Sequence, residues 1–411
     1  MSIEVPYKIA VPDEELDLLR KKLDLVKFPD ELEKSGWKYG VPLNDVKRLA
    51  ARWRDGYNWK AEESKLNDEL PQFTRDIEVE GYGRLNIHYV HQKSQVPDAI
   101  PLLFVHGWPG SFIEVRALLP LLTQVSSKHP SFHVVALSLP GYGFSEGPSK
   151  PGFRSLQYAE IGNKLMLALG YNEYGEYCNS KKFDLVLKKI AEVYGNTHSK
   201  AWHTNMPGGM APQFLREPFL YLRHLVSPYS TAEKAGLARS QWFAKRGMGY
   251  FHEQATQPQT LGYSLADSPV GLLAWIYEKL INWTDNYLWT DDEVLTWVSI
   301  YYFSRAGPAA STRIYYEIMR ERESDSKVVR PTIPFGVSHF PKELNIRPRL
   351  WTRTMGNLVF EAEHASGGHF AAYERPKALA SDLRKMFGRG GPAYGVVEGH
   401  KGYQTHAKAK L

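Results

Sequence analysis

The 411-residue chain has a single cysteine, Cys178, and its apolar residues never form a long unbroken run. One cysteine excludes an intrachain disulfide framework and favours a reducing compartment. No apolar segment approaches the roughly 18 residues of a membrane-spanning helix, and the first residues lack the apolar stretch of a signal peptide. We therefore expect a cytoplasmic protein without an integral membrane anchor.

A strong charge of either sign is also missing. The 51 Lys and Arg residues exceed the 45 Asp and Glu residues only slightly, and they are scattered along the chain, which predicts no nucleic-acid partner. The histidines are dispersed, and neither a phosphate-binding loop nor a dinucleotide fingerprint is present. These absences predict a protein that uses no metal ion and no cofactor.

The residues that are present, 43% hydrophobic and 13% aromatic, are typical of a globular protein. Short apolar strands at residues 101–105 and 132–139 alternate with helical segments, and this alternation predicts an α/β fold with a mostly parallel, doubly wound sheet. We expect five segments: a helical meander with a first hairpin strand (1–90), the first part of the sheet domain (91–206), a helical lid (207–325), the second part of the sheet domain (326–390) and a disordered tail (391–411).

One turn is the natural centre of a site. The strand at residues 101–105 ends at residues 106–111, which read His-Gly-Trp-Pro-Gly-Ser. Such a Gly/Pro-rich turn leaves backbone N–H groups free to face a cavity. In α/β-hydrolases the loop after this strand supplies one donor of the oxyanion hole.

Several motifs occur in a fixed order along the chain. They are Trp53 and Trp59 with residues 71–74, the turn at 106–111, and segments 139–145, 267–275 and 367–372. In this order and spacing the chain resembles the microsomal-type epoxide hydrolase family from about residue 5 to residue 387. The resemblance implies an α/β-hydrolase fold with an N-terminal helical meander and an inserted helical lid.

The resemblance also implies a chemistry and its residues. In the family a carboxylate attacks an epoxide carbon, and a histidine then activates the water that hydrolyses the resulting ester. His369 matches this base and Glu343 matches the acid that orients it. Tyr250 and Tyr315 match the two tyrosines that polarise the epoxide oxygen, and Trp108 matches the backbone oxyanion-hole donor.

The expected partner is a small apolar epoxide, which water converts to a vicinal diol; a homodimer is compatible with the sequence, which does not decide the oligomeric state. A purely structural role is the alternative at each position, since a histidine, a tyrosine or a Glu beside a Lys usually serves packing or solvation. Tyr316 competes with Tyr315 at a one-residue slip, although it should point away from the same helix face.

The family's nucleophile is missing. It is the Asp of a Gly-Gly-Asp-Trp-Gly turn, whereas residues 174–184 read Tyr-Gly-Glu-Tyr-Cys-Asn-Ser-Lys-Lys-Phe-Asp. Counting forward from Gly170 puts the nucleophile position at Ser180, and counting back from Ala191 puts it at Lys181. The small residues that a strained elbow needs are absent, and residues 175–177 are poor material for a buried strand.

Three explanations are open. The segment is a wrongly joined translation of the gene, or the protein is an altered enzyme, or it is a catalytically dead binding protein. In the altered enzyme, His369 and Glu343 activate water directly, or activate a hydroxyl group of the substrate as in a cyclase. A Ser esterase built on Ser180 is a different reaction, and Asp184 as a displaced nucleophile lies a turn beyond the elbow.

Overall fold

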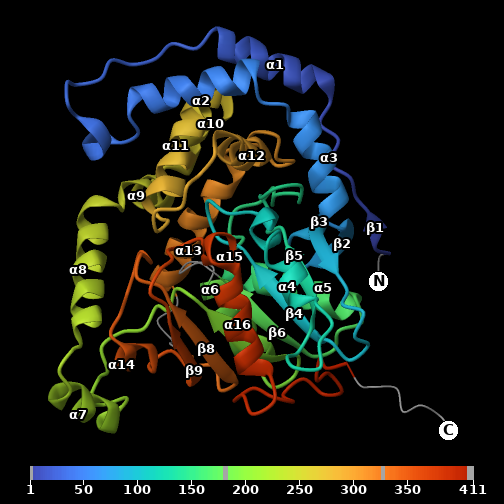
Figure 1. Cartoon of the computed structure of the whole chain (residues 1–411), viewed down its shortest axis with the longest axis vertical. Coiled ribbons are helices and arrows are strands. Elements are labelled where there is room, and N and C mark those ends of the chain that lie inside the picture. Colours follow the sequence, from blue (N-terminus) through green and yellow to red (C-terminus); the bar gives the residue numbers. More distant parts are fainter. Residues whose placement is uncertain (1–2, 179–183, 325–328, 405–411) are drawn as a thin grey trace.

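The computed structural model describes residues 3–178, 184–324 and 329–404 (Figure 1). Its described strands form one sheet of nine, in the order β1-β2-β3-β5-β4-β6-β7-β8-β9. Pairings from β5 to β9 are parallel, and those among β1, β2, β3 and β5 are antiparallel. The strands are β1 (Val5–Pro6), β2 (Gln72–Val79), β3 (Gly83–Gln92), β4 (Ile100–Val105), β5 (Phe132–Leu137), β6 (Tyr174–Cys178), β7 (Ser199–Thr204), β8 (Pro334–His339) and β9 (Asn357–Glu363). The predicted α/β-hydrolase fold with a mostly parallel sheet is confirmed.

Helices cover both faces of this sheet. Helix α5 (Ser155–Ala168) packs against α6 (Asp184–Tyr194) on one face, where Tyr174 of β6 donates a 2.8 Å hydrogen bond to Asn163. The next residue, Gly175, faces Phe387 of α16 (Pro376–Phe387) on the other face. Because both faces are covered, β4 and β5 are buried along their whole length, which explains their unbroken apolar sequences.

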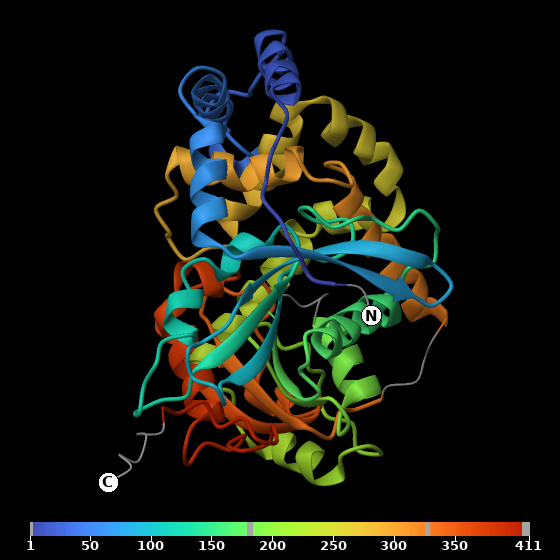
Figure 2. The ribbon, with the colours of Figure 1, turned by 90° about the vertical axis from the view of Figure 1, so that its right-hand side faces the viewer.

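A helical insertion separates β7 from β8 and lies over one end of the sheet (Figures 1 and 2). Its helices are α7 (Pro218–Val226), α8 (Thr231–Arg246), α9 (Gly249–Thr256), α10 (Pro258–Asp267), α11 (Pro269–Asn282), α12 (Asp291–Tyr302), η3 (Ala310–Thr312) and α13 (Arg313–Ser324). Shorter helices lie elsewhere in the sheet domain: η2 (Phe112–Val115), α4 (Leu119–Leu122), α14 (Arg349–Thr352) and α15 (Ala371–Glu374). Residues 112–122 thus form two short helices, η2 and α4. No helix in the described residues combines the length and apolarity needed to cross a bilayer.

The N-terminal helices cover the insertion rather than the sheet (Figure 2). They are α1 (Asp13–Asp24), η1 (Gly36–Tyr39), α2 (Leu43–Asp55) and α3 (Trp59–Glu69). The tryptophans of the lead-in motif explain this placement. The Trp53 ring lies 5.8 Å from that of Tyr302, and the Trp59 ring lies 5.4 Å from that of Phe303, so both anchor the lead-in to the end of α12.

The expected disordered tail is wrong as far as residue 404. Val397 and Tyr403 are buried, and the Gly402 N–H donates a 2.8 Å hydrogen bond to the Asp98 carbonyl oxygen. The Ser131 N–H in turn donates to the Gly402 carbonyl oxygen at 2.7 Å. The prediction of disorder followed the Gly- and Lys-rich composition and gave no weight to two apolar side chains, Val397 and Tyr403. Their burial offsets the entropic cost of ordering this segment.

Strand β6 contradicts the expectation that residues 175–177 cannot form a buried strand. The segment lies between β4 and β7, and all five residues of β6 are buried. Glu176 is fully buried, and its carboxylate has no hydrogen-bond partner of normal geometry among the described residues. Burial raises the pKa of this carboxyl to about 8, with a small opposing effect from the Ser199 hydroxyl.

This carboxyl group makes stability depend on pH. A pKa raised from 4.5 to about 8 means that the folded chain binds the proton more tightly than the unfolded chain does. The contribution of Glu176 to stability is therefore highest below about pH 4.5 and falls as the pH rises towards 8, by about 5 kcal/mol in all. Replacing Glu176 by Gln is expected to remove this slope from urea unfolding measured across that pH range. The exposed Glu78 is the matched control, because Glu78→Gln should leave the slope unchanged.

Candidate active site

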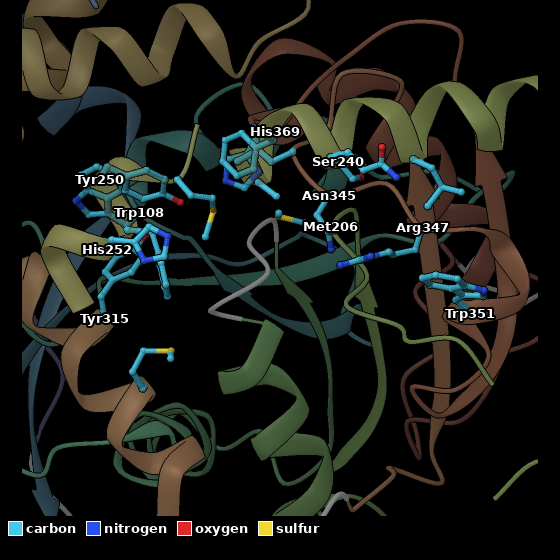
Figure 3. A pocket seen from close by; sticks show the side chains of 18 residues that line it. Trp108, Met206, Ser240, Tyr250, His252, Tyr315, Asn345, Arg347, Trp351 and His369 are labelled. Carbon is cyan, nitrogen blue, oxygen red and sulfur yellow. The ribbon is translucent and has the colours of Figure 1, made fainter. Parts of the chain in front are cut away.

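A cavity of about 600 Å³ lies at the carboxyl ends of the parallel strands, under the helical insertion (Figure 3). The turn after β4 contributes Trp108, and the loop after β7 contributes Met206. The loops after β8 and β9 contribute Leu344 and His369, and helices α8, α9 and α13 close the cavity. Open α/β sheets bind ligands at this edge.

His369 and Glu343 form a buried pair. The His369 Nδ1 and the Glu343 Oε1 are 2.8 Å apart, and the two side chains are 3% and 2% exposed. The His369 backbone N–H donates to the Trp283 carbonyl oxygen at 2.8 Å, which fixes the loop after β9 against the insertion. Because Nδ1 faces the carboxylate, Nε2 is the nitrogen left for the cavity that His369 lines. This arrangement suits an imidazole that accepts a proton from a bound molecule.

Asn205 hydrogen-bonds to both members of this pair, and the sequence analysis did not identify it as a site residue. Its Nδ2 donates to the Glu343 Oε2 at 2.9 Å and to the His369 carbonyl oxygen at 3.3 Å. Its Oδ1 accepts a 2.7 Å hydrogen bond from the Tyr177 hydroxyl. The available signal was its position, directly after a parallel strand at the ligand-binding edge. Asn205 thus holds acid and base together.

Tyr250 on α9 and Tyr315 on α13 meet in the cavity wall. Their rings are 5.9 Å apart at 80°, and a hydrogen bond joins their hydroxyl groups. Burial raises the pKa of both phenols above the ordinary tyrosine value, so both stay protonated and can donate. Tyr316 is half-buried below the Arg320 guanidinium, and it does not line the cavity.

Trp108 aligns both tyrosines. Its ring stacks on Tyr250 at 5.1 Å and 9°, and it meets the Tyr315 ring edge-on at 5.8 Å. The turn that carries Trp108 is fixed from below, since the Tyr301 hydroxyl donates to the Gly110 carbonyl oxygen at 2.6 Å. Gly110 is required here, because a Cβ atom would lie 1.7 Å from the Glu114 carboxylate.

Trp283 connects the tyrosines to the histidine. Its ring centroid lies 5.1 Å from that of Tyr250 and 5.2 Å from that of His369. No sequence motif singled out this residue. In the structure Trp283 packs against both side chains from outside the cavity lining.

The nucleophile position lies outside the described residues. Both Ser180 and Lys181 fall in the gap between the end of β6 at Cys178 and the start of α6 at Asp184. The other predicted residues are described: His369, Tyr250, Tyr315 and Trp108 line one cavity, and Glu343 is hydrogen-bonded to His369. No group of His, Cys, Asp and Glu residues in the described part of the chain could hold a metal ion.

Comparison with known proteins identifies the family. The sequence-family model for the epoxide hydrolase N terminus matches residues 4–115, and that for the alpha/beta hydrolase fold matches residues 100–174. Epoxide hydrolase 1 of Sus scrofa is 34% identical over 93% of this chain and 88% of its own length.

Solved structures agree. The Aspergillus niger epoxide hydrolase superposes with a TM-score of 0.79 at 33% identity, covering 93% of this chain and 95% of that one. Juvenile hormone epoxide hydrolase from the silkworm Bombyx mori superposes with a TM-score of 0.81 at 28% identity, covering 93% of each chain. The chain therefore belongs to the microsomal-type epoxide hydrolase family and is an epoxide hydrolase with an α/β-hydrolase fold.

Proposed function

We propose that this protein adds water to an epoxide with an apolar body and releases a vicinal diol. The observation that carries the proposal is the convergence of a buried His–Glu pair and two protonated phenols on one largely apolar cavity. The aromatic wall of Trp108, Phe243 and Phe251 suits the apolar body of the substrate. The tyrosine hydroxyls donate to the epoxide oxygen and polarise the ring.

In the sequence as written, the attacking group is water. His369 Nε2 takes a proton from the water while its oxygen forms a bond to one epoxide carbon. The carbon–oxygen bond of the ring breaks, and its electron pair goes to the epoxide oxygen, which accepts a proton from a tyrosine hydroxyl. Glu343 stabilises the imidazolium, which then returns its proton to the tyrosine through solvent. His369, Glu343 and the tyrosine thereby return to their starting protonation states.

The oxygen isotope of the diol tests this step. In a single turnover in H₂¹⁸O with enzyme in excess over styrene oxide, direct attack is expected to put ¹⁸O into the diol at once. A carboxylate nucleophile would instead transfer its own unlabelled oxygen, and label would enter only after later turnovers. Unlabelled diol from the first turnover would therefore overturn direct attack. The control is the uncatalysed hydration of styrene oxide in the same labelled water.

A second candidate for the first step is favoured by the end of the hydrolase-fold match at residue 174, directly before the altered segment. In this case the native protein carries an Asp elbow, and an ester intermediate forms. The Trp108 backbone N–H then stabilises the oxyanion when water hydrolyses that ester. Peptide mass spectrometry of the native protein separates the two. Peptides that read residues 176–181 as written support water attack, and peptides with Asp at this place support the ester route.

The other functions are separated with two substrates. Diol formation from styrene oxide supports epoxide hydrolysis, whereas cleavage of p-nitrophenyl acetate that Ser180→Ala abolishes supports the esterase. An epoxide-opening cyclase gives a cyclic ether rather than a diol from an epoxide that carries a hydroxyl group. A binding protein turns over none of these compounds.

A further inference from the structure

The side of the cavity away from the tyrosines carries unsatisfied hydrogen-bond donors. The three atoms are Asn345 Nδ2, Arg347 Nε and Trp351 Nε1, each buried and without a hydrogen-bond partner among the described residues. All three residues line the cavity that holds His369 and the tyrosines. Figure 3 shows the Arg347 side chain extending from the Trp351 side towards Asn345 and Met206. Buried donors without partners are rare in native proteins, so this cluster indicates a ligand.

Arg347 is also uncompensated in charge. Within the described residues it forms no ion pair, whereas its neighbours Arg349 and Arg353 are paired with Glu363 and Glu361. Burial alone lowers the pKa of the Arg347 guanidinium, with no contribution from a carboxylate. A partly buried cation without a counter-ion is costly, and a bound anion would offset that cost.

The surroundings hold this guanidinium in place. Its Cζ lies 5.7 Å from the centroid of the Trp351 ring, within the range of a cation–π contact. Nearby, the Arg239 guanidinium donates to the carbonyl oxygens of Glu343 and Lys342, at 2.8 and 2.7 Å. Arg239 lies outside the cavity lining, and the Glu343 and Asp285 carboxylates act on it electrostatically. The positive charge at this end of the cavity is therefore that of Arg347. A planar guanidinium fork matches the two oxygens of a carboxylate.

We infer that Arg347, with Asn345 and Trp351, binds a carboxylate group of the substrate. This inference rests on the proposed function and deepens it. The substrate class becomes an epoxide with an apolar body whose ring lies at the tyrosines and whose carboxylate lies at Arg347. A purely apolar epoxide would leave these donors without partners, so it would be a poorer substrate than the acid.

Binding measurements test the inference without any turnover. The probes are ω-phenylalkanoic acids of increasing chain length and their primary amides, which have no epoxide, titrated by calorimetry. At the best chain length the acid is expected to bind ten- to a hundredfold more tightly than the amide, as for a charge-assisted hydrogen bond. Arg347→Met should remove this preference and leave the affinity for the amide unchanged. Arg349→Met is the matched control, since Arg349 lies outside the cavity, and it should keep the preference.

Three results would overturn the inference. They are equal affinity for acid and amide, an equal loss of both affinities in Arg347→Met, and acetate or phosphate alone binding as tightly as the best acid. The last result would mean a site for free anions. Thermal unfolding of Arg347→Met shows whether the variant is folded, and Arg347→Lys, which keeps the charge without the fork, should retain part of the preference.

Different results would contradict the proposed function and the carboxylate site. Arg347-dependent acid binding without hydrolysis of any epoxide would contradict the proposed function and support the carboxylate site. Hydrolysis of epoxides with no advantage for the acid, in either affinity or kcat/KM, would support the function and contradict the carboxylate site.

Discussion

Replacing His369 by Ala is expected to lower kcat for epoxide hydrolysis by about 10²–10⁴-fold, the usual contribution of a positioned general base. His369 lines the cavity, and its Nδ1 lies 2.8 Å from Glu343, so its Nε2 is the proton acceptor for the attacking water. Without it the water must attack unaided. KM should change little, because the apolar wall that holds the substrate is unaltered. Steady-state diol formation measures both constants.

Glu343→Gln should lower kcat by a comparable factor. An amide at this place can donate to Nδ1, which moves the imidazole proton to Nε2 and removes the base from the cavity. The double variant should lose little more than either single variant, because the two residues act as one unit. The matched control is His252→Ala: His252 lines the same cavity but is exposed and on α9. A similar loss in His252→Ala would point to general damage of the cavity, and full activity of His369→Ala would end the proposed mechanism.

Removing either phenol hydroxyl is the second large effect. Tyr250→Phe and Tyr315→Phe are each expected to lower kcat by about 10²–10³-fold, the cost of losing one donor to a developing oxyanion in a site that excludes water. The double variant should approach the rate of hydration in water. Because each ring is packed against Trp108, removing only the oxygen leaves the wall intact. Pre-steady-state diol formation measures these rates.

Tyr316→Phe is the matched control, since Tyr316 is next in sequence but does not line the cavity. Its kcat should remain within a fewfold of the parent value, and a loss equal to that of Tyr315→Phe would contradict the assignment. Burial raises the pKa of both phenols, so the parent activity should not fall with tyrosine ionisation near pH 10, the ordinary tyrosine value. Alkaline loss of activity that either Phe substitution abolishes would contradict the protonated state.

The sequence by itself determined the fold class, because buried parallel strands such as β4 and β5 are covered on both faces and so appear as unbroken apolar runs. The motifs around Trp108, His369 and Tyr315 are local in sequence, and the family resemblance therefore located them. The resemblance also selected Tyr315, and helix geometry placed Tyr316 on a different face; of the two, only Tyr315 lines the cavity in the structure.

The tertiary structure alone decided what depends on neighbours distant in sequence. It paired Asn205 with Glu343 across 138 residues, and it buried Glu176 inside the sheet although its side chain is polar. It also ordered residues 391–404 through the burial of Val397 and Tyr403, and it left Arg347 in the cavity without a counter-ion among the described residues. Each outcome is set by which groups surround a side chain in space, and local patterns of polarity do not contain that information.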